Sequence, residues 1–174
     1  MDNIFEFKII NIHWMDNSDY RRDLCPHGKV FVKIDNEILS DNNSQDWTLS
    51  ATGLYLLRSL KNDYELFMYK NYLLPCCGFD FWLNENNNVS FMGCNSGIDF
   101  KIKHKENKMV KIISENNSNV IITENDFSNI VYDFITEVEM YYDNNKKRKV
   151  HKDNKMGYKI LWEEWKKLKN DYYK

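Results

Sequence analysis

The side chains best suited to chemistry in this chain are its few cysteines and histidines. The 174 residues include four cysteines and four histidines. Zinc binds about four thiolate or imidazole ligands arranged as a tetrahedron, and converging loops would supply that set from Cys25, His27, Cys76 and Cys94. A thiolate beside a base could instead act as a nucleophile. One alternative is therefore a thiol- or zinc-dependent enzyme that uses the cluster Cys25, Cys76, Cys77 and Cys94.

The spacing of these residues favours a structural role over either chemistry. The chain has no Cys-x-x-Cys pair, and adjacent cysteines such as Cys76 and Cys77 seldom bind the same ion. It also lacks the nucleophile elbow, the phosphate-binding loop, the dinucleotide fingerprint and the His-Glu-x-x-His motif. We therefore expect no catalytic residues, no metal and no cofactor, and we interpret all four cysteines as reduced thiols.

Charge is divided unevenly along the chain, although the formal net charge is only −2. Residues 1–143 hold 13 Lys and Arg against 22 Asp and Glu, a balance of −9, whereas residues 144–174 hold 11 against 4, a balance of +7. An acidic surface can attract and hold a basic protein domain. The acidic residues that we expect to contact such a partner lie in the first polar loop and on one helix face: Asp16, Asp19, Asp23, Asp133 and Glu137.

The basic stretch near the C-terminus does not by itself indicate a nucleic-acid partner. Residues 146–149 read Lys-Lys-Arg-Lys, but proteins that bind nucleic acid usually present a basic domain or a patterned basic face. We interpret this stretch as a solvated hinge between two helices. Trp162 and Trp165 have helical spacing, which is more typical of a core than of an exposed stacking surface.

The N-terminal elements can be placed from hydrophobic periodicity. Residues 3–14 and 29–39 read as strands, separated by a polar loop over 16–28. A buried helix is predicted over 48–60, because apolar or small residues recur at helical spacing: Leu49, Gly53, Leu56, Leu57 and Leu60. Gly53 costs such a helix about 1 kcal/mol relative to Ala, which is tolerable if another element packs closely against the backbone there.

The rest of the chain alternates short apolar runs with turns and then becomes helical. From 72 to 122 the pattern predicts an antiparallel meander. Helical stripes follow over 127–142 and 158–172, joined by a polar, basic linker. The predicted fold class is therefore α+β, a single domain in which an antiparallel β-meander sheet is packed by about three helices. Within it, residues 1–143 form an α+β core, and 144–174 form a basic linker and an amphipathic helix packed on the same domain.

Only a few features of the sequence bear on the cellular location of the protein. No run of about 18 apolar residues exists, so no membrane span is expected. The first residues lack a basic segment followed by an apolar one, so we expect a cytoplasmic protein without a secretory signal. The oligomeric state is left open.

Several short stretches are familiar as a set. The most specific is residues 47–60, Trp-Thr-Leu-Ser-Ala-Thr-Gly-Leu-Tyr-Leu-Leu-Arg-Ser-Leu, and it is joined by 27–30, 74–79, Cys94 with 97–100, and 157–165. The set resembles a group of small, largely uncharacterised bacterial proteins associated with the immunity proteins of polymorphic toxin systems. The resemblance covers about residues 27–165. It implies a cytosolic protein that binds and blocks a cognate toxin, and it implies no particular site residues.

Overall fold

The strand-like residues near the N-terminus form one antiparallel sheet. The computed structural model of the chain describes residues 4–15, 22–69, 71–76, 80–83, 88–92, 95–145 and 147–173. The first sheet has the order β1–β3–β4 and comprises β1 (Phe5–Ile9), β3 (Val30–Ile34) and β4 (Glu37–Ser40). The predicted alternation in β3 is confirmed, because Val30, Val32 and Ile34 are all fully buried. A turn at Asp35 joins β3 to β4.

The second sheet is a meander of three consecutive strands. Its order is β10–β11–β12, formed by β10 (Phe100–Lys105), β11 (Met109–Ser114) and β12 (Asn119–Thr123). A 3-10 turn, η2 (Glu106–Lys108), links the first two strands. Asn107 (φ 60°) and Asn117 (φ 68°) adopt the left-handed backbone conformation in the two connections, which Asn tolerates better than most residues.

The other described strands pair as three short antiparallel ladders. They are β2 (His27–Gly28) with β5 (Trp47–Thr48), β6 (Leu74–Pro75) with β9 (Gly97–Ile98), and β7 (Asp80–Leu83) with β8 (Val89–Met92). In the sequence, the β7–β8 hairpin is inserted between the paired strands β6 and β9. The strands of the predicted meander are therefore divided, and only the last three form a continuous sheet.

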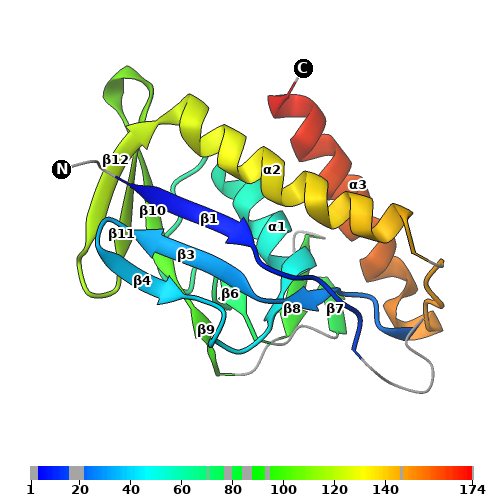
Figure 1. Cartoon of the computed structure of the whole chain (residues 1–174). Coiled ribbons are helices and arrows are strands. Elements are labelled where there is room, and N and C mark those ends of the chain that lie inside the picture. Colours follow the sequence, from blue (N-terminus) through cyan, green and yellow to red (C-terminus); the bar gives the residue numbers. More distant parts are fainter. Residues whose placement is uncertain are drawn as a thin grey trace.

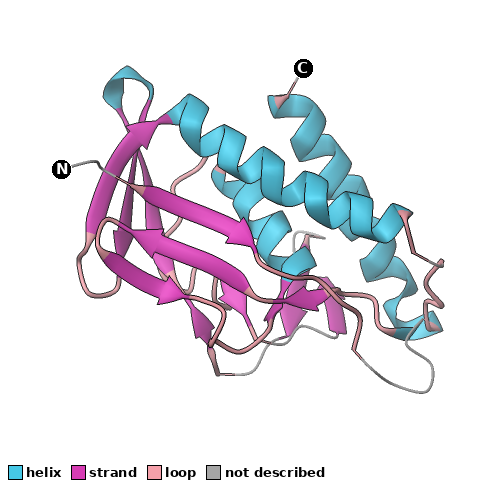
Figure 2. Ribbon diagram, viewed as in Figure 1, coloured by secondary structure: helices cyan, strands magenta, loops and turns pink. Residues whose placement is uncertain are grey.

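Three α-helices pack on these strands within the described residues, which confirms the α+β fold class. They are α1 (Leu49–Ser59), α2 (Glu124–Asp143) and α3 (Lys155–Tyr172), and a 3-10 turn, η3 (Lys152–Asn154), precedes the last. In Figure 1, α2 runs alongside β1, with α1 and α3 behind it. Figure 2 shows the helices gathered on one side of the strands.

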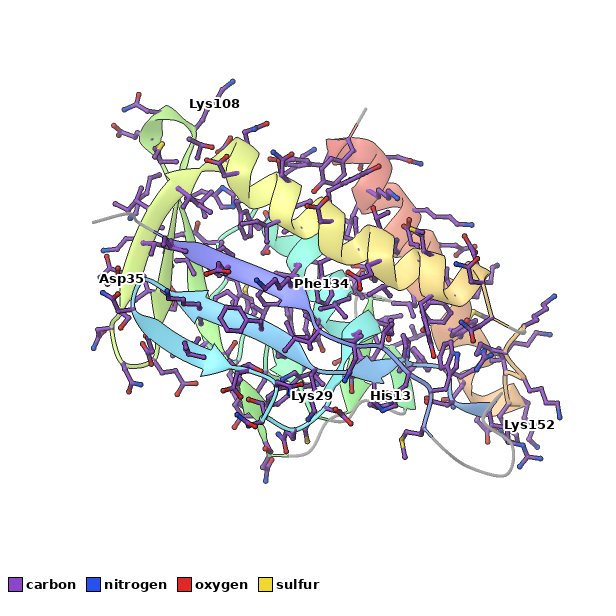
Figure 3. All side chains as sticks on the ribbon, in the orientation of Figure 1. His13, Lys29, Asp35, Lys108, Phe134 and Lys152 are labelled. Carbon is purple, nitrogen blue, oxygen red and sulfur yellow. The ribbon has the colours of Figure 1, made fainter. Side chains whose placement is uncertain are left out.

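The core lies where the inner faces of the two large sheets meet α2. Phe7 on β1 packs against Phe100 on β10 (ring centroids 6.1 Å apart) and against Phe134 on α2 (5.2 Å apart). Figure 3 shows Phe134 between α2 and the first sheet. The start of α2 is fixed by Thr123, whose hydroxyl accepts a hydrogen bond from the backbone N–H of Asp126 (3.0 Å), as an N-cap does.

The predicted burial of α1 is confirmed, since every residue of the helix except Arg58 is buried. The close approach required at Gly53 is also present. A β-carbon placed on Gly53 would lie 2.4 Å from Cη2 of Trp165, so the backbone of α1 and the indole ring of α3 are in direct contact. The last helix therefore packs on the same body as the sheets. Among the described residues, no helix is long and apolar enough to cross a membrane.

Candidate functional site

Asp23, a predicted partner contact, lies in the loop that leads into β2. Its carboxylate is hydrogen-bonded to backbone N–H groups on either side of it in the sequence. Its Oδ2 accepts a hydrogen bond from the N–H of Met15 (2.8 Å), and its Oδ1 accepts one from the N–H of Cys25 (3.2 Å). Nδ1 of His27 lies 3.6 Å from Oδ2, and the Asp23 side chain is only 8% exposed. Asp23 therefore shapes its own loop. Asp16 and Asp19, the other two predicted contacts in this loop, lie outside the described residues.

The thiol of Cys25 is poorly suited to nucleophilic chemistry. The residue is 1% exposed and is not in a disulfide. Burial raises the pKa of the thiol far above its ordinary value; the neighbouring Ser50 hydroxyl lowers it by less, and the Asp23 carboxylate raises it further. Because the thiolate is the reactive form, Cys25 is held in its unreactive state.

Cys25 is therefore expected to resist alkylation in the folded protein. Iodoacetamide at neutral pH should leave the Cys25-containing peptide unmodified until denaturant is added, because the thiol is both protonated and inaccessible. Peptide mass spectrometry before and after unfolding gives the comparison. Rapid labelling of Cys25 under native conditions would contradict this assignment and restore the nucleophile alternative.

The other cysteines require a correction. Cys76 is disulfide-bonded, so the expectation of four reduced thiols is wrong at this position. The pairing of β6 with β9 carries Cys76 to a distant part of the chain, where its N–H donates to the carbonyl of Ser96 (3.2 Å). The spacing of the cysteines along the sequence does not indicate that β6 pairs with β9. Cys77 and Cys94 lie outside the described residues, within which no group of three or more His, Cys, Asp or Glu could hold a metal.

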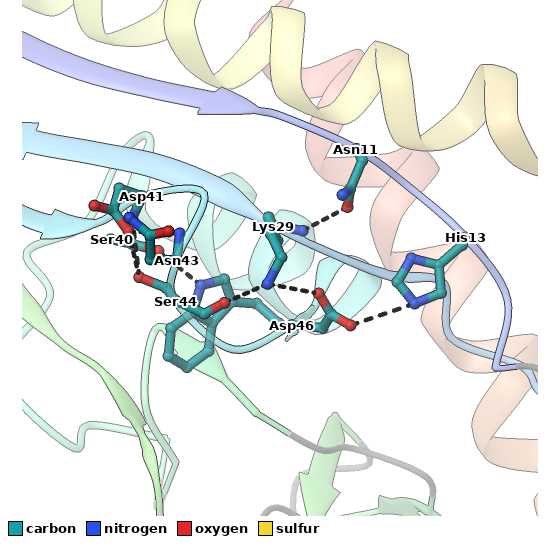
Figure 4. A network of polar contacts seen from close by, with 9 residues as sticks. Asn11, His13, Lys29, Ser40, Asp41, Asn43, Ser44 and Asp46 are labelled. Atoms are coloured by element: carbon teal, nitrogen blue, oxygen red, sulfur yellow. Dashed lines mark hydrogen bonds and ion pairs between the residues drawn. The ribbon is translucent and has the colours of Figure 1, made fainter.

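A second polar cluster lies where β3 begins, and it joins the side chains of His13, Lys29 and Asp46 (Figure 4). Nε2 of His13 lies 3.4 Å from Oδ2 of Asp46, and Nζ of Lys29 lies 3.5 Å from Oδ1 of the same carboxylate. Lys29 also donates to the carbonyl of Ser44, and its backbone N–H donates to Oδ1 of Asn11 (2.9 Å). Because these bonds connect the 41–46 loop to the residue before β3 and to the segment that follows β1, the cluster holds that loop in place.

The two remaining predicted contacts are placed together on the outer side of α2. Asp133 and Glu137 are one helical turn apart, and both are exposed. Among the described residues, neither carboxylate is in an ion pair with a Lys, Arg or His. Met140, one further turn along, is 57% exposed. We call Asp133, Glu137 and Met140 the acidic α2 face. Partial burial raises the pKa of Glu137 above its ordinary value.

A cavity of about 670 Å³ separates the C-terminal half of α2 from α3, and we call it the α2–α3 groove. Its aromatic lining includes Tyr142 and Trp162, whose rings meet edge to face with centroids 4.7 Å apart. Glu139 lies at one side and accepts hydrogen bonds from Nε1 of Trp165 (2.7 Å) and Nζ of Lys169 (2.5 Å). This groove combines fixed rings with positively charged side chains.

Arg148 is the least expected member of the groove, because it belongs to the stretch interpreted as a solvated hinge. It is only 8% exposed, and its guanidinium lies 3.8 Å from the centroid of the Trp14 ring. That interpretation is therefore wrong for Arg148, although its neighbours Lys147 and Lys149 are exposed. A planar guanidinium stacks well on an indole ring, and this contact anchors the linker to the N-terminal segment.

The α2–α3 groove was not predicted from the sequence. The helical stripes correctly placed Tyr142 and Trp162 on the core-facing sides of their helices. Periodicity within one helix does not indicate where two neighbouring helices move apart and leave a groove. The available signal was an Arg inside a lysine run, because Arg and Lys differ in their capacity for stacking.

Comparison with known proteins finds no matching family model, no matching curated protein and no matching solved structure. The resemblance to immunity proteins accordingly stays a prediction.

Proposed function

We propose that this chain is a non-enzymatic, cytoplasmic binding protein that neutralises a cognate toxin, in the manner of an immunity protein. The observation that carries the proposal is the acidic α2 face. Asp133 and Glu137 project from one side of a long helix, and no described cationic side chain is ion-paired with them. Unpaired carboxylates on a partner-facing surface attract a basic domain and orient it during encounter.

The acidic α2 face is held in place by the buried side of the same helix, which suits it to binding a partner. The opposite side of α2 is buried through Val131, Phe134, Ile135 and Val138. The carboxylates are therefore held on a rigid element, which reduces the entropy lost when a partner docks. Met140 supplies exposed apolar surface beside them, and mixed apolar and charged patches are typical of protein interfaces.

The thiol-enzyme alternative receives no support from Cys25, because its thiol is buried and its pKa is raised. The binding proposal is therefore the one that we develop.

The test begins with the product of the neighbouring gene. That product should arrest growth when expressed alone, and co-expression of this chain should relieve the arrest. The double variant Asp133→Lys/Glu137→Lys should bind the purified partner at least about tenfold more weakly, chiefly through slower association, and with a weaker salt dependence. Glu106→Lys is the matched control, since Glu106 is also an exposed carboxylate but lies in the η2 turn.

Two results would contradict the proposal. One is growth arrest that this chain fails to relieve. The other is a loss of binding free energy for Glu106→Lys that reaches half of the loss for the α2 double variant. Because the single substitution changes the net charge by half as much, the effect would then lie in net charge and not in the acidic α2 face.

A further inference from the structure

Another cavity, of about 850 Å³, lies between the start of α2, the end of α3 and the η2 turn. In Figure 1 the end of α3 lies beside the first half of α2, where the hydroxyl of Tyr173 donates a hydrogen bond to the carbonyl of Ser128 (2.7 Å). We call this cavity the tyrosine groove, because its lining includes Tyr132, Tyr172 and Tyr173. We propose that the tyrosine groove binds a short, neutral saccharide. This site does not depend on a toxin partner.

The tyrosines of the groove are held against one another by the fold. The ring of Tyr173 meets those of Tyr132 (centroids 4.9 Å apart, 62° between planes) and Tyr172 (5.1 Å, 64°) edge to face. Tyr132 is nevertheless 40% exposed. A sugar ring carries C–H groups on its faces, and their weakly positive hydrogens pack on the negative face of an aromatic ring. Tyr132 therefore offers a fixed apolar surface on which a sugar can stack.

Three side-chain amides line the same groove, and they belong to Asn107, Asn125 and Asn129. All three residues are exposed, and among the described residues none of these amides has a hydrogen-bond partner in the protein. A carboxamide both donates and accepts hydrogen bonds. A sugar hydroxyl does the same, so the amides of the groove suit a ligand that carries many hydroxyl groups.

The two walls of the groove place these groups close to the exposed ring. Asn125, Asn129 and Tyr132 follow one face of α2, because they are spaced four and three residues apart. Asn107 (φ 60°) and Lys108 (φ 57°) form the rim at the η2 turn, and both adopt the left-handed backbone conformation. Two successive residues other than glycine are uncommon in this conformation, and backbone strain of this kind is concentrated at binding sites.

Charge and size favour a small neutral ligand. The charged residues in the described lining are Lys108 and Glu124, which have opposite sign. A polyanion would also meet the exposed carboxylates of Asp126 and Asp133, which lie beside the groove on α2 and would repel it. The cavity of about 850 Å³ lies within the range of roughly 300–1,000 Å³ that is usual for small-molecule sites.

Isothermal titration calorimetry with the full chain tests this proposal. The probes are three neutral trisaccharides, namely maltotriose, cellotriose and triacetylchitotriose. Each is added to about 10 mM, so that binding with a dissociation constant near 1 mM is detected. At least one of them should bind saturably, and that probe is then used with the variants.

Two pairs of variants assign the binding to the tyrosine groove. Tyr132→Ala should weaken binding at least about tenfold, whereas Tyr132→Phe should stay within about threefold because the ring is retained. Asn129→Ala should weaken binding at least about fivefold, whereas Asn170→Ala should stay within about twofold. Asn129 and Asn170 are both exposed on helices, but Asn170 lines the α2–α3 groove instead. Alanine is the better helix former, so neither asparagine variant is expected to disturb folding.

Three results would overturn the proposal. They are the absence of saturable binding of all three trisaccharides, wild-type affinity in Tyr132→Ala, and equal weakening by Asn129→Ala and Asn170→Ala. Tighter binding of an anionic heparin tetrasaccharide than of any neutral probe would also overturn it, because the groove would then select for charge.

Discussion

Replacement of Trp165 by alanine is expected to lower the free energy of unfolding by about 3–5 kcal/mol. Trp165 is fully buried, and its ring contacts the backbone of α1 at Gly53. Its Nε1 donates to Glu139 (2.7 Å), so truncation removes a hydrogen bond as well as a large apolar surface. The resulting cavity would lie between α1 and α3 and could not close, because the glycine backbone has no side chain to fill it.

Denaturant unfolding followed by circular dichroism measures this loss. Lys167→Ala is the matched control on the exposed side of the same helix, and we expect it to change the free energy of unfolding by less than about 0.5 kcal/mol. A loss below about 1 kcal/mol for Trp165→Ala would contradict the packing between α1 and α3.

The same contact can be tested from the other side. Gly53→Ala would gain about 1 kcal/mol from helix propensity alone. We expect a net loss instead, because the new β-carbon would lie 2.4 Å from Cη2 and 2.8 Å from Cζ3 of Trp165. In a Trp165→Phe background the smaller ring leaves room, so Gly53→Ala should cost less there. Additive effects of the two changes would show that these residues do not touch.

Replacement of Asp99 by alanine is expected to lower the free energy of unfolding by at least about 3 kcal/mol. Asp99 is 3% exposed. Its carboxylate accepts hydrogen bonds from the Tyr64 hydroxyl (2.8 Å), the N–H of Phe67 (2.7 Å) and the N–H of Leu73 (3.1 Å). Alanine would leave these buried donors without their acceptor. Asp41→Ala in an outer loop, whose donors remain open to water, is the control and should cost much less.

The raised pKa of Asp99 predicts that the free energy of unfolding depends on pH. Burial raises the pKa of this carboxyl, and the hydrogen bonds that it accepts offset only part of the shift. Because the folded-state pKa exceeds the unfolded value of about 3.9, the part of the free energy of unfolding that depends on protonation of Asp99 is fully present below pH about 3.9 and is lost as pH rises through the folded-state pKa.

Asp99→Asn cannot titrate, so the free energy of unfolding of the wild type minus that of this variant should fall as pH rises from about 4. Urea unfolding at several pH values, starting near pH 3, provides the measurement. A difference that stays constant, or that grows with pH, would contradict the raised pKa.

The sequence pattern alone was sufficient to predict the elements whose apolar residues follow a single period along their whole length. The apolar stripe of α1, the alternation in β3 and the helical repeats of α2 and α3 each place their buried residues correctly. These features are readable because side-chain direction follows from the backbone alone, with a period of two or 3.6 residues. The need for a close contact at Gly53 was also readable, since a glycine inside a buried stripe requires an explanation.

The candidate sites were readable only in part. Asp133 and Glu137 were expected on an exposed helix face and lie there. Asp23 was expected to contact a partner, and its carboxylate accepts hydrogen bonds within its own loop. Charge along the sequence does not distinguish these cases, because a carboxylate near a turn can accept local N–H groups as readily as it can face solvent.

The sequence by itself determined the α+β class, the order of the helices and the division of charge between an acidic body and a basic end, because these depend on composition and on short-range periodicity. Only the tertiary structure decided that β6 pairs with β9, that Arg148 is buried against Trp14, and that α2 and α3 separate to form a groove. Each of these joins residues far apart in the chain, and such contacts are selected by the free energy of packing the whole core and not by the residues adjacent to them in sequence.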